Sequence, residues 1–206
     1  MMKYRVAVYL FVVFNLSLTA VAQKIEISLK NNTPDEAKTK AQLERLIAAH
    51  DLTKWTFTRK VEIDEKVIPH SHPVLTMSAR HIKDDELLLS TYVHEQIHWH
   101  LVNLSKETDE AIKELRVLFP KVPAGGPEGA RDENSTYLHL LVCYLEYRAD
   151  RELMGELKAK QVIEFWSTDH YNWVYRTVLE RARDIGNIAF KYKLVPQQIL
   201  VPMQKS

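Results

Sequence analysis

The chain has 206 residues and a nearly balanced charge, with 28 Lys and Arg against 27 Asp and Glu, and 46% of its residues are hydrophobic. This size suits one domain with a full core, and the net charge of +1 argues against nucleic acid or another polyanion as a partner. The single cysteine, Cys143, excludes an internal disulfide framework, and its apolar neighbours indicate a buried, inert thiol.

Residues 1–22 have the pattern of a secretory signal peptide. Two basic residues precede an apolar run at 6–18, and the small residues that signal peptidase prefers follow at 20–22. We therefore expect cleavage before Gln23 and a secreted or periplasmic chain, in which residues 23–206 form one domain without stable membrane insertion. The alternative is an uncleaved N-terminal anchor.

A helix and two short strands are predicted in the first part of the mature chain. Thr33 can cap a helix that runs to about His50, since Pro34 and two acidic residues fill its first turn. Alternation of aromatic or β-branched residues with polar ones predicts strands at 55–63 and, more briefly, at 73–79.

A buried helix is predicted over residues 85–104. Asp84 and Asp85 can cap its N-terminus, and apolar residues recur along it at helical spacing. These apolar residues are Leu87, Leu88, Leu89, Val93, Ile97, Leu101, Val102 and Leu104.

The second half of the chain is predicted to be mostly helical. Helices are expected at 108–119 and at 132–158, and the Pro- and Gly-rich stretch at 120–129 is expected to be a loop. Ser167 or Thr168 can cap a last helix. The C-terminal tail, residues 194–206, is expected to pack through Leu194, Ile199 and Leu200.

Residues 94–98, His-Glu-Gln-Ile-His, place two imidazoles and a carboxylate on the buried helix. His94 and His98 are four residues apart and share one face, so they can hold one tetrahedral zinc from adjacent turns. Glu95 lies about 100° around the helix, beside the metal, where a general base for zinc-bound water is needed. Since the chain has nine histidines, the alternative is a chance match on a polar helix face.

Catalytic zinc needs a third protein ligand, and the next long helix offers several candidates. Glu146 and Asp150 are four residues apart, so one can bind metal while the other accepts a hydrogen bond from a ligating histidine. His139 lies two turns before Glu146 on the same face, and Asp132 and Glu133 begin the helix. Glu146 ranks first because only it is followed by an aspartate one turn later. The alternative is a solvated acidic pair beside two arginines.

With HExxH on one helix and ExxxD on a later one, the chain resembles the gluzincin metallopeptidases over about residues 73–158. Its small size invites comparison with the short minigluzincins and with the catalytic cores of the larger membrane-embedded members, and no named subfamily is identified. The resemblance implies a small zincin-like α+β domain with a short β-sheet, an HExxH active-site helix and a mostly helical C-terminal half. It implies that His94, His98 and Glu146 are zinc ligands, that Glu95 is the general base, and that Asp150 orients a histidine.

The resemblance also implies parts of the site that the motifs do not contain. A gluzincin usually supplies a His, Tyr or Arg from its later part to stabilise the oxyanion, and His170 is the first candidate here and Tyr175 the second. The strand nearest the active site pairs with extended substrate, which favours Val74–Ser78. His70 and His72 precede this strand, where flanking prolines favour an exposed turn over a place in the cleft.

The sequence therefore predicts an exported zinc metallopeptidase that hydrolyses a peptide or protein substrate with zinc-activated water and Glu95 as the base. One alternative keeps zinc without catalysis, as an exported structural or binding module in which His139 or another side chain closes the fourth position. Another is a hydrolase that stays inactive until a partner or cleavage opens its cleft. Substrate specificity depends on pockets that only the fold brings together.

Overall fold

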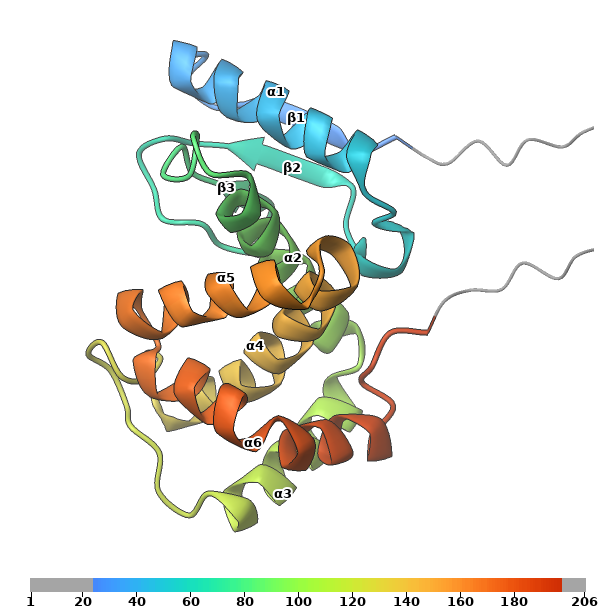
Figure 1. Cartoon of the computed structure of the whole chain (residues 1–206), viewed down its shortest axis with the longest axis vertical. Coiled ribbons are helices and arrows are strands. Elements are labelled where there is room, and N and C mark those ends of the chain that lie inside the picture. The colour runs from blue at the N-terminus through green and yellow to red at the C-terminus, as the bar shows by residue number, and fades with distance from the viewer. Residues whose placement is uncertain (1–23, 198–206) are drawn as a thin grey trace, which may run out of the picture.

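The computed structural model describes residues 24–197, which form a small α+β domain (Figure 1). A three-stranded sheet with one helix beside it lies at one end of the domain, and helices make up the rest (Figure 1). The predicted fold class, a short sheet followed by a mostly helical C-terminal half, is confirmed. The elements are β1 (Glu26–Leu29), α1 (Pro34–Ala49), a 3-10 turn (Thr53–Trp55), β2 (Lys60–Ile63), β3 (Leu75–Met77), α2 (Asp85–Asn103), α3 (Ser105–Leu118), α4 (Glu133–Met154), α5 (Glu156–Asp169) and α6 (Asn172–Lys191).

Two sequence predictions lie outside the described residues. One is the signal peptide at residues 1–22, and the other is the packing of Ile199 and Leu200 in the tail. The third tail residue, Leu194, is described and is fully buried in the core.

The sheet is parallel and its strand order is β1-β2-β3. Strand β1 was not predicted, because its four residues include a single buried side chain, Ile27, and show no clear alternation. The predicted strand at 55–63 is wrong in its first half. Trp55 belongs to the 3-10 turn, where it is buried, and β2 begins only at Lys60.

The outer side of β3 is bonded to the loop that precedes it. The backbone N–H of His70 donates to the carbonyl of Thr76 at 3.0 Å, and the N–H of Thr76 donates to the carbonyl of His70 at 2.8 Å. The chain therefore already occupies, at Thr76, the backbone groups that an added peptide strand would need.

The N-terminus of α1 joins the β1–α1 loop to the loop after β2. Thr33 caps α1 as predicted, because its Oγ1 accepts a hydrogen bond from the Glu36 N–H at 3.2 Å. The buried Glu36 carboxylate accepts from the Asn31 N–H at 2.8 Å, the Asn31 side-chain amide at 2.7 Å and the Glu65 N–H at 3.3 Å. Glu36 thus fixes the start of the loop at residues 65–69.

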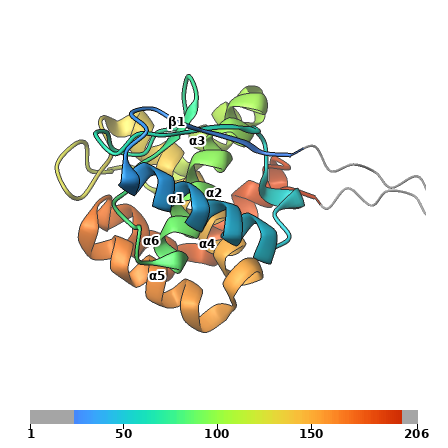
Figure 2. The ribbon, with the colours of Figure 1, turned by 90° about the horizontal axis from the view of Figure 1, so that it is seen from above.

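Helix α2 lies between the sheet and the other helices, and α4 is the centre of the helical part (Figures 1 and 2). The Asp84 side chain caps α2 as predicted, by accepting from the Leu87 N–H at 2.9 Å. Along its length α2 packs against β3 and α1 as well as against α4 and α5, while α4 also contacts α3 and α6. Their apolar residues share one core, so α2 and α4 face each other across buried surface.

The helical segment predicted for residues 132–158 is two helices. Helix α4 ends at Met154, and Gly155 has φ 85° and ψ 161°, a conformation that breaks the helix before α5. Ser167 and Thr168 were expected to cap the last helix, but they lie inside α5. Their hydroxyls donate to carbonyls three residues earlier, at 2.7 and 2.9 Å. Helix α6 instead follows Tyr171, a residue in the left-handed region with φ 49°.

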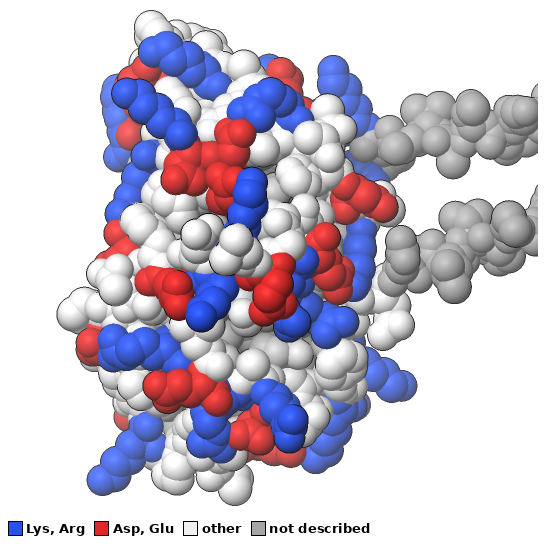
Figure 3. Space-filling view, viewed as in Figure 1, with Lys and Arg blue, Asp and Glu red and all other residues white. Residues whose placement is uncertain are grey.

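The face of the molecule seen in Figure 3 carries interspersed charges of both signs over the helical part and the sheet end. Among residues 24–197, no helix combines the length and the apolar character needed to cross a membrane.

Candidate metal site

Helix α2 brings His94 and His98 together as the motif predicts. The Nε2 atoms of the two rings are 3.3 Å apart, and the His94 side chain is almost fully buried. This separation is short because both imidazoles leave the same helix face from adjacent turns. The two nitrogens therefore point at a common position.

His139 reaches the same position from α4. Its ring centroid is 5.7 Å from that of His94 and 5.1 Å from that of His98, and ligand atoms of all three rings lie within 4.8 Å of one another. The Nδ1 of His139 is 2.7 Å from the carbonyl oxygen of Ser135, to which it donates, so Nε2 keeps its lone pair. Burial lowers the pKa of His139 to about 3, which favours the neutral, metal-binding form. These three histidines form a buried group that could hold a metal ion.

Glu146 lies on the other side of the His94 ring. Its Oε2 is 2.8 Å from Nδ1 of His94 and also accepts a hydrogen bond from the Tyr175 hydroxyl at 3.0 Å. The thiol of Cys143 is close enough to complete a second group of potential metal ligands, His94, Cys143 and Glu146. The structure therefore contains two ligand sets that share His94, and Glu146 belongs to the one at its Nδ1 side.

Burial and Glu146 act in opposite directions on His94. Burial lowers the pKa of His94, but the negative charge of Glu146 outweighs it, and the resulting pKa lies well above the usual value. In the absence of metal the two residues therefore form a buried ion pair. Metal binding at Nε2 would release the proton held there.

Asp150 does not bond to a histidine in this structure. Its Oδ2 is 2.9 Å from Oγ of Ser90, whose hydroxyl is also 2.6 Å from Oε1 of Glu146 and accepts from Nε1 of Trp166 at 3.1 Å. One hydroxyl has one proton, so it cannot donate to both carboxylates. Burial and the charge of Glu146 raise the pKa of Asp150 well above its usual value, which favours the protonated form, the form that can donate to Ser90 while Ser90 donates to Glu146.

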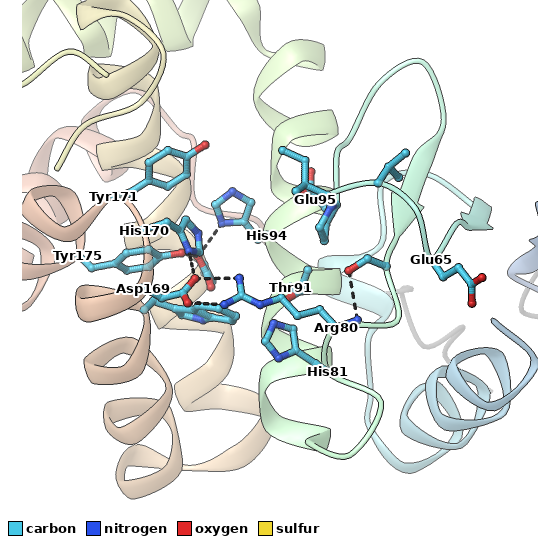
Figure 4. A pocket seen from close by; sticks show the side chains of 16 residues that line it. Glu65, Arg80, His81, Thr91, His94, Glu95, Asp169, His170, Tyr171 and Tyr175 are labelled. Atoms are coloured by element: carbon cyan, nitrogen blue, oxygen red, sulfur yellow. Dashed lines mark hydrogen bonds and ion pairs between the residues drawn. The ribbon is translucent and has the colours of Figure 1, made fainter. Parts of the chain in front are cut away.

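Glu95 lies near His94 at the wall of a cavity of about 530 Å³ (Figure 4). Its side chain is buried, and burial raises the pKa of Glu95 to about 7. A carboxyl group with this pKa can both accept and release a proton near neutral pH, as a general base in hydrolysis must. His94 and Glu146 line the same cavity, which therefore reaches the histidine group at His94.

The two predicted oxyanion-stabilising residues also line this cavity, but in different ways. The hydroxyl of Tyr175 donates to Glu146, and the residue is almost fully buried. His170 is partly exposed, and its Nδ1 is 2.8 Å from Oδ2 of Asp169. The other ring nitrogen of His170, Nε2, has no hydrogen-bond partner among the described residues, whereas the Tyr175 hydroxyl is already bonded.

Tyr171 is a cavity residue that the sequence did not single out. Its ring lies 4.4 Å from that of His139, and its left-handed backbone turns the chain between α5 and α6 at this point. The only sequence signal was its position next to His170. A tyrosine in the left-handed region is uncommon, and such backbone outliers concentrate at functional sites.

His70 and His72 lie at the edge of the site. The His72 ring stacks on Trp99 of α2 at 4.2 Å and is exposed, as an exposed turn predicts. His70 is partly buried and bridges to β3. Neither belongs to a potential ligand group among the described residues.

No family model, no curated protein and no solved structure matches this chain.

Proposed function

We propose that this protein is an exported zinc metallopeptidase whose metal is held by His94, His98 and His139. The observation that carries the proposal is the convergence of three imidazoles whose ligand atoms lie within 4.8 Å of one another, with Glu95 next to His94 at the wall of a cavity. Three protein ligands with one open position are typical of catalytic zinc, and a carboxylate beside the metal suits hydrolysis. The signal-like pattern of residues 1–22 supports export.

The donor set suits zinc. Neutral imidazole is a preferred zinc ligand, and the outer nitrogens of His94 and His139 already have partners that orient the rings. This arrangement favours Glu146 as the group that orients His94, and His139 as the third ligand in its place. Bound zinc would lower the pKa of a water molecule toward neutrality and polarise the scissile carbonyl.

The chain's own residues would divide the remaining work. Glu95 would take a proton from the attacking water and pass it to the leaving amine, for which its raised pKa is suited. Burial around Glu95 and His94 excludes bulk water and strengthens the electrostatic interactions there. His170 and Tyr171 also line the cavity, across from Glu95 in Figure 4, where groups that bind the developing oxyanion are needed.

The loop at residues 65–69 is the substrate-facing part of the sheet end in this proposal. The predicted segment Val74–Ser78 is less suited, because Thr76 is already bonded to His70 and all of β3 is buried. Val67 and Ile68 lie at the cavity and are exposed, the latter 83%. Apolar side chains in such a position suit an apolar residue of a peptide substrate.

Glu95→Gln tests the proposal. The variant should keep its fold and its zinc, because Glu95 is not a ligand, and hydrolysis should fall by about a hundredfold or more. Zinc content measured by atomic emission and cleavage of a quenched-fluorescent peptide library give the two readouts. His94→Ala is the matched control that should lose zinc and activity together.

Full hydrolysis by pure Glu95→Gln would contradict the role of Glu95. Bound zinc without hydrolysis in the wild-type protein would instead support the structural module, for which the Cys143-containing ligand set is the specific observation.

A further inference from the structure

An ion pair joins two walls of the cavity. Arg80 lies in the loop between β3 and α2, and Asp169 is the last residue of α5. Nη1 of Arg80 donates to Oδ2 of Asp169 at 2.9 Å, and Nη2 donates to Oδ1, so the contact is bidentate. Figure 4 shows the Arg80 side chain extending from the α2 side toward Asp169 and His170.

The position of Asp169 makes it dependent on this arginine. A carboxylate at the C-terminal end of a helix lies at the negative end of the helix dipole, and the last turn of α5 contains no basic residue. Arg80 compensates from outside the helix, and its hydrogen bonds are the main cause of the lowered pKa of Asp169. Without Arg80, the carboxylate would gain by turning toward water.

Asp169 in turn holds the His170 ring. Oδ2, the oxygen that accepts from Nη1 of Arg80, is also 2.8 Å from Nδ1 of His170. Rings of Trp166, Tyr171 and Tyr175 surround the imidazole, with centroids at 5.2, 4.8 and 5.7 Å. The ring is therefore packed on its sides and fixed at Nδ1, which leaves Nε2 as the nitrogen available to a bound molecule.

We infer that Arg80 is a positioning residue for His170, which it holds at the cavity wall through Asp169. The consequence for catalysis rests on the proposed function, since only a hydrolase has an oxyanion for His170 to stabilise. The geometric part of the inference, the orientation and tautomer of the His170 ring, does not rest on the proposed function.

Long-range proton–nitrogen NMR spectra of the histidine rings in the zinc-loaded protein test the geometric part. The His170 resonances, assigned with His170→Gln, should show the Nδ1-protonated form in the wild type. In Arg80→Met they should shift toward the Nε2-protonated form or broaden, and Arg80→Lys should restore them in part, because lysine keeps the charge without the bidentate geometry.

Arg45→Met is the matched control. Arg45 is about as exposed as Arg80 and makes a bidentate ion pair with Asp85, at 2.9 and 2.6 Å, but neither Arg45 nor Asp85 lines the cavity. Its loss should leave the His170 resonances unchanged. If Arg80→Met unfolds the protein, Arg80→Gln, which removes the charge and the bidentate contact but keeps a polar side chain, makes the same test.

Kinetics then separate this inference from the proposed function. With a cleaved peptide, Arg80→Met should lower kcat about tenfold, with KM within about twofold, since a small displacement of a catalytic group is costly. Unchanged His170 resonances in Arg80→Met would overturn the inference whatever the activity. Shifted His170 resonances in Arg80→Met, in a protein that cleaves no peptide, would support the positioning role of Arg80 and contradict the proposed peptidase function.

Discussion

His94 is held from both of its ring nitrogens, by His98 and His139 near Nε2 and by Glu146 at Nδ1. The two potential ligand sets that share His94 cannot both be the primary metal site, because each uses a different nitrogen of the His94 ring. A carboxylate on the outer nitrogen of a ligating histidine is a common arrangement, which favours the three-histidine set.

Substitutions at three positions distinguish the two sets. His139→Ala should weaken zinc binding by more than about a hundredfold because it removes a ligand, whereas Glu146→Gln should weaken it about 10- to 100-fold, as expected for an outer partner. Cys143→Ser should leave the affinity unchanged. Competition with a chromophoric zinc chelator measures all three. A large loss in Cys143→Ser with none in His139→Ala would identify the other set.

The sequence was sufficient to bring His94, Glu95 and His98 together, since all three lie within two turns of one helix. It ranked Glu146 ahead of His139 because of the following Asp150, but that spacing does not show which turn of α4 meets α2. Both lie on the same face of α4, two turns apart, and the turn that meets α2 depends on how the two helices cross. That crossing is a property of packed side chains far apart in the chain.

At the scale of elements, the caps of α1 and α2 were predictable because each is a local hydrogen bond between neighbouring residues. Helix α5 was not predicted as a separate helix. A single Gly155 divides two helical patterns, and an isolated glycine inside a helical pattern is compatible with either a break or a continuous helix. Strand β1 was missed because it is paired only by a distant segment, β2.

Glu36→Gln should destabilise the α1 N-terminus in a pH-dependent way. Burial raises the pKa of Glu36, but hydrogen bonds from Asn31 and the Glu65 N–H outweigh it, so the folded pKa lies below the ordinary value of 4.5. A carboxyl group whose pKa is lower in the folded than in the unfolded protein stabilises the fold at pH values above the unfolded-state pKa. This stabilisation is lost as the pH falls through the folded-state pKa. In urea unfolding, the variant should therefore have a lower free energy of unfolding than the wild type at pH 7, and this difference should shrink below about pH 4.

Asp35→Asn serves as the control for this comparison. Asp35 is the preceding residue, in an exposed pair with Lys38, and exposed pairs of this kind contribute little. If Glu36→Gln lowers the free energy of unfolding equally at pH 7 and pH 3, the charge of Glu36 is not what holds the loop.

Gly155→Ala should cost roughly 1–3 kcal/mol of unfolding free energy, because its φ and ψ lie in a region that almost only glycine adopts. Among the described residues, no heavy atom beyond the glycine and its two chain neighbours lies within 4 Å of the added methyl group, so the cost is backbone strain and not a clash. Leu157→Ala, two residues later and 73% exposed, should change stability by less than about 0.5 kcal/mol. Chemical denaturation of both variants makes the comparison, and equal stabilities would contradict the strained geometry.

At the scale of the whole molecule, the histidine group connects helices that belong to different parts of the domain. Helix α2 packs on the sheet and α4 organises the other helices. A metal ion bound to both would therefore strengthen the contact between the two parts. It would also bind the folded state far better than the unfolded chain, whose histidines are dispersed.

Zinc should therefore raise the melting temperature. At a free concentration a hundred times Kd, a single site adds about 2.7 kcal/mol, which is roughly 5–10 °C for a chain of this size. Differential scanning calorimetry with zinc and with a chelator measures the shift. The variant with alanine at His94, His98 and His139 should melt at the same temperature in both, and a full shift in that variant would place the metal elsewhere.

The two helices that carry the three histidines are separated in the chain by α3 and a long loop. As the chain is synthesised from its N-terminus, His94 and His98 are complete before His139 has been added. Two imidazoles on one helix bind metal weakly, so capture of the ion must wait until α4 has formed and docked. If this group binds metal as proposed, its loading is one of the last steps of maturation, and a chain truncated before α4 lacks one of the three ligands.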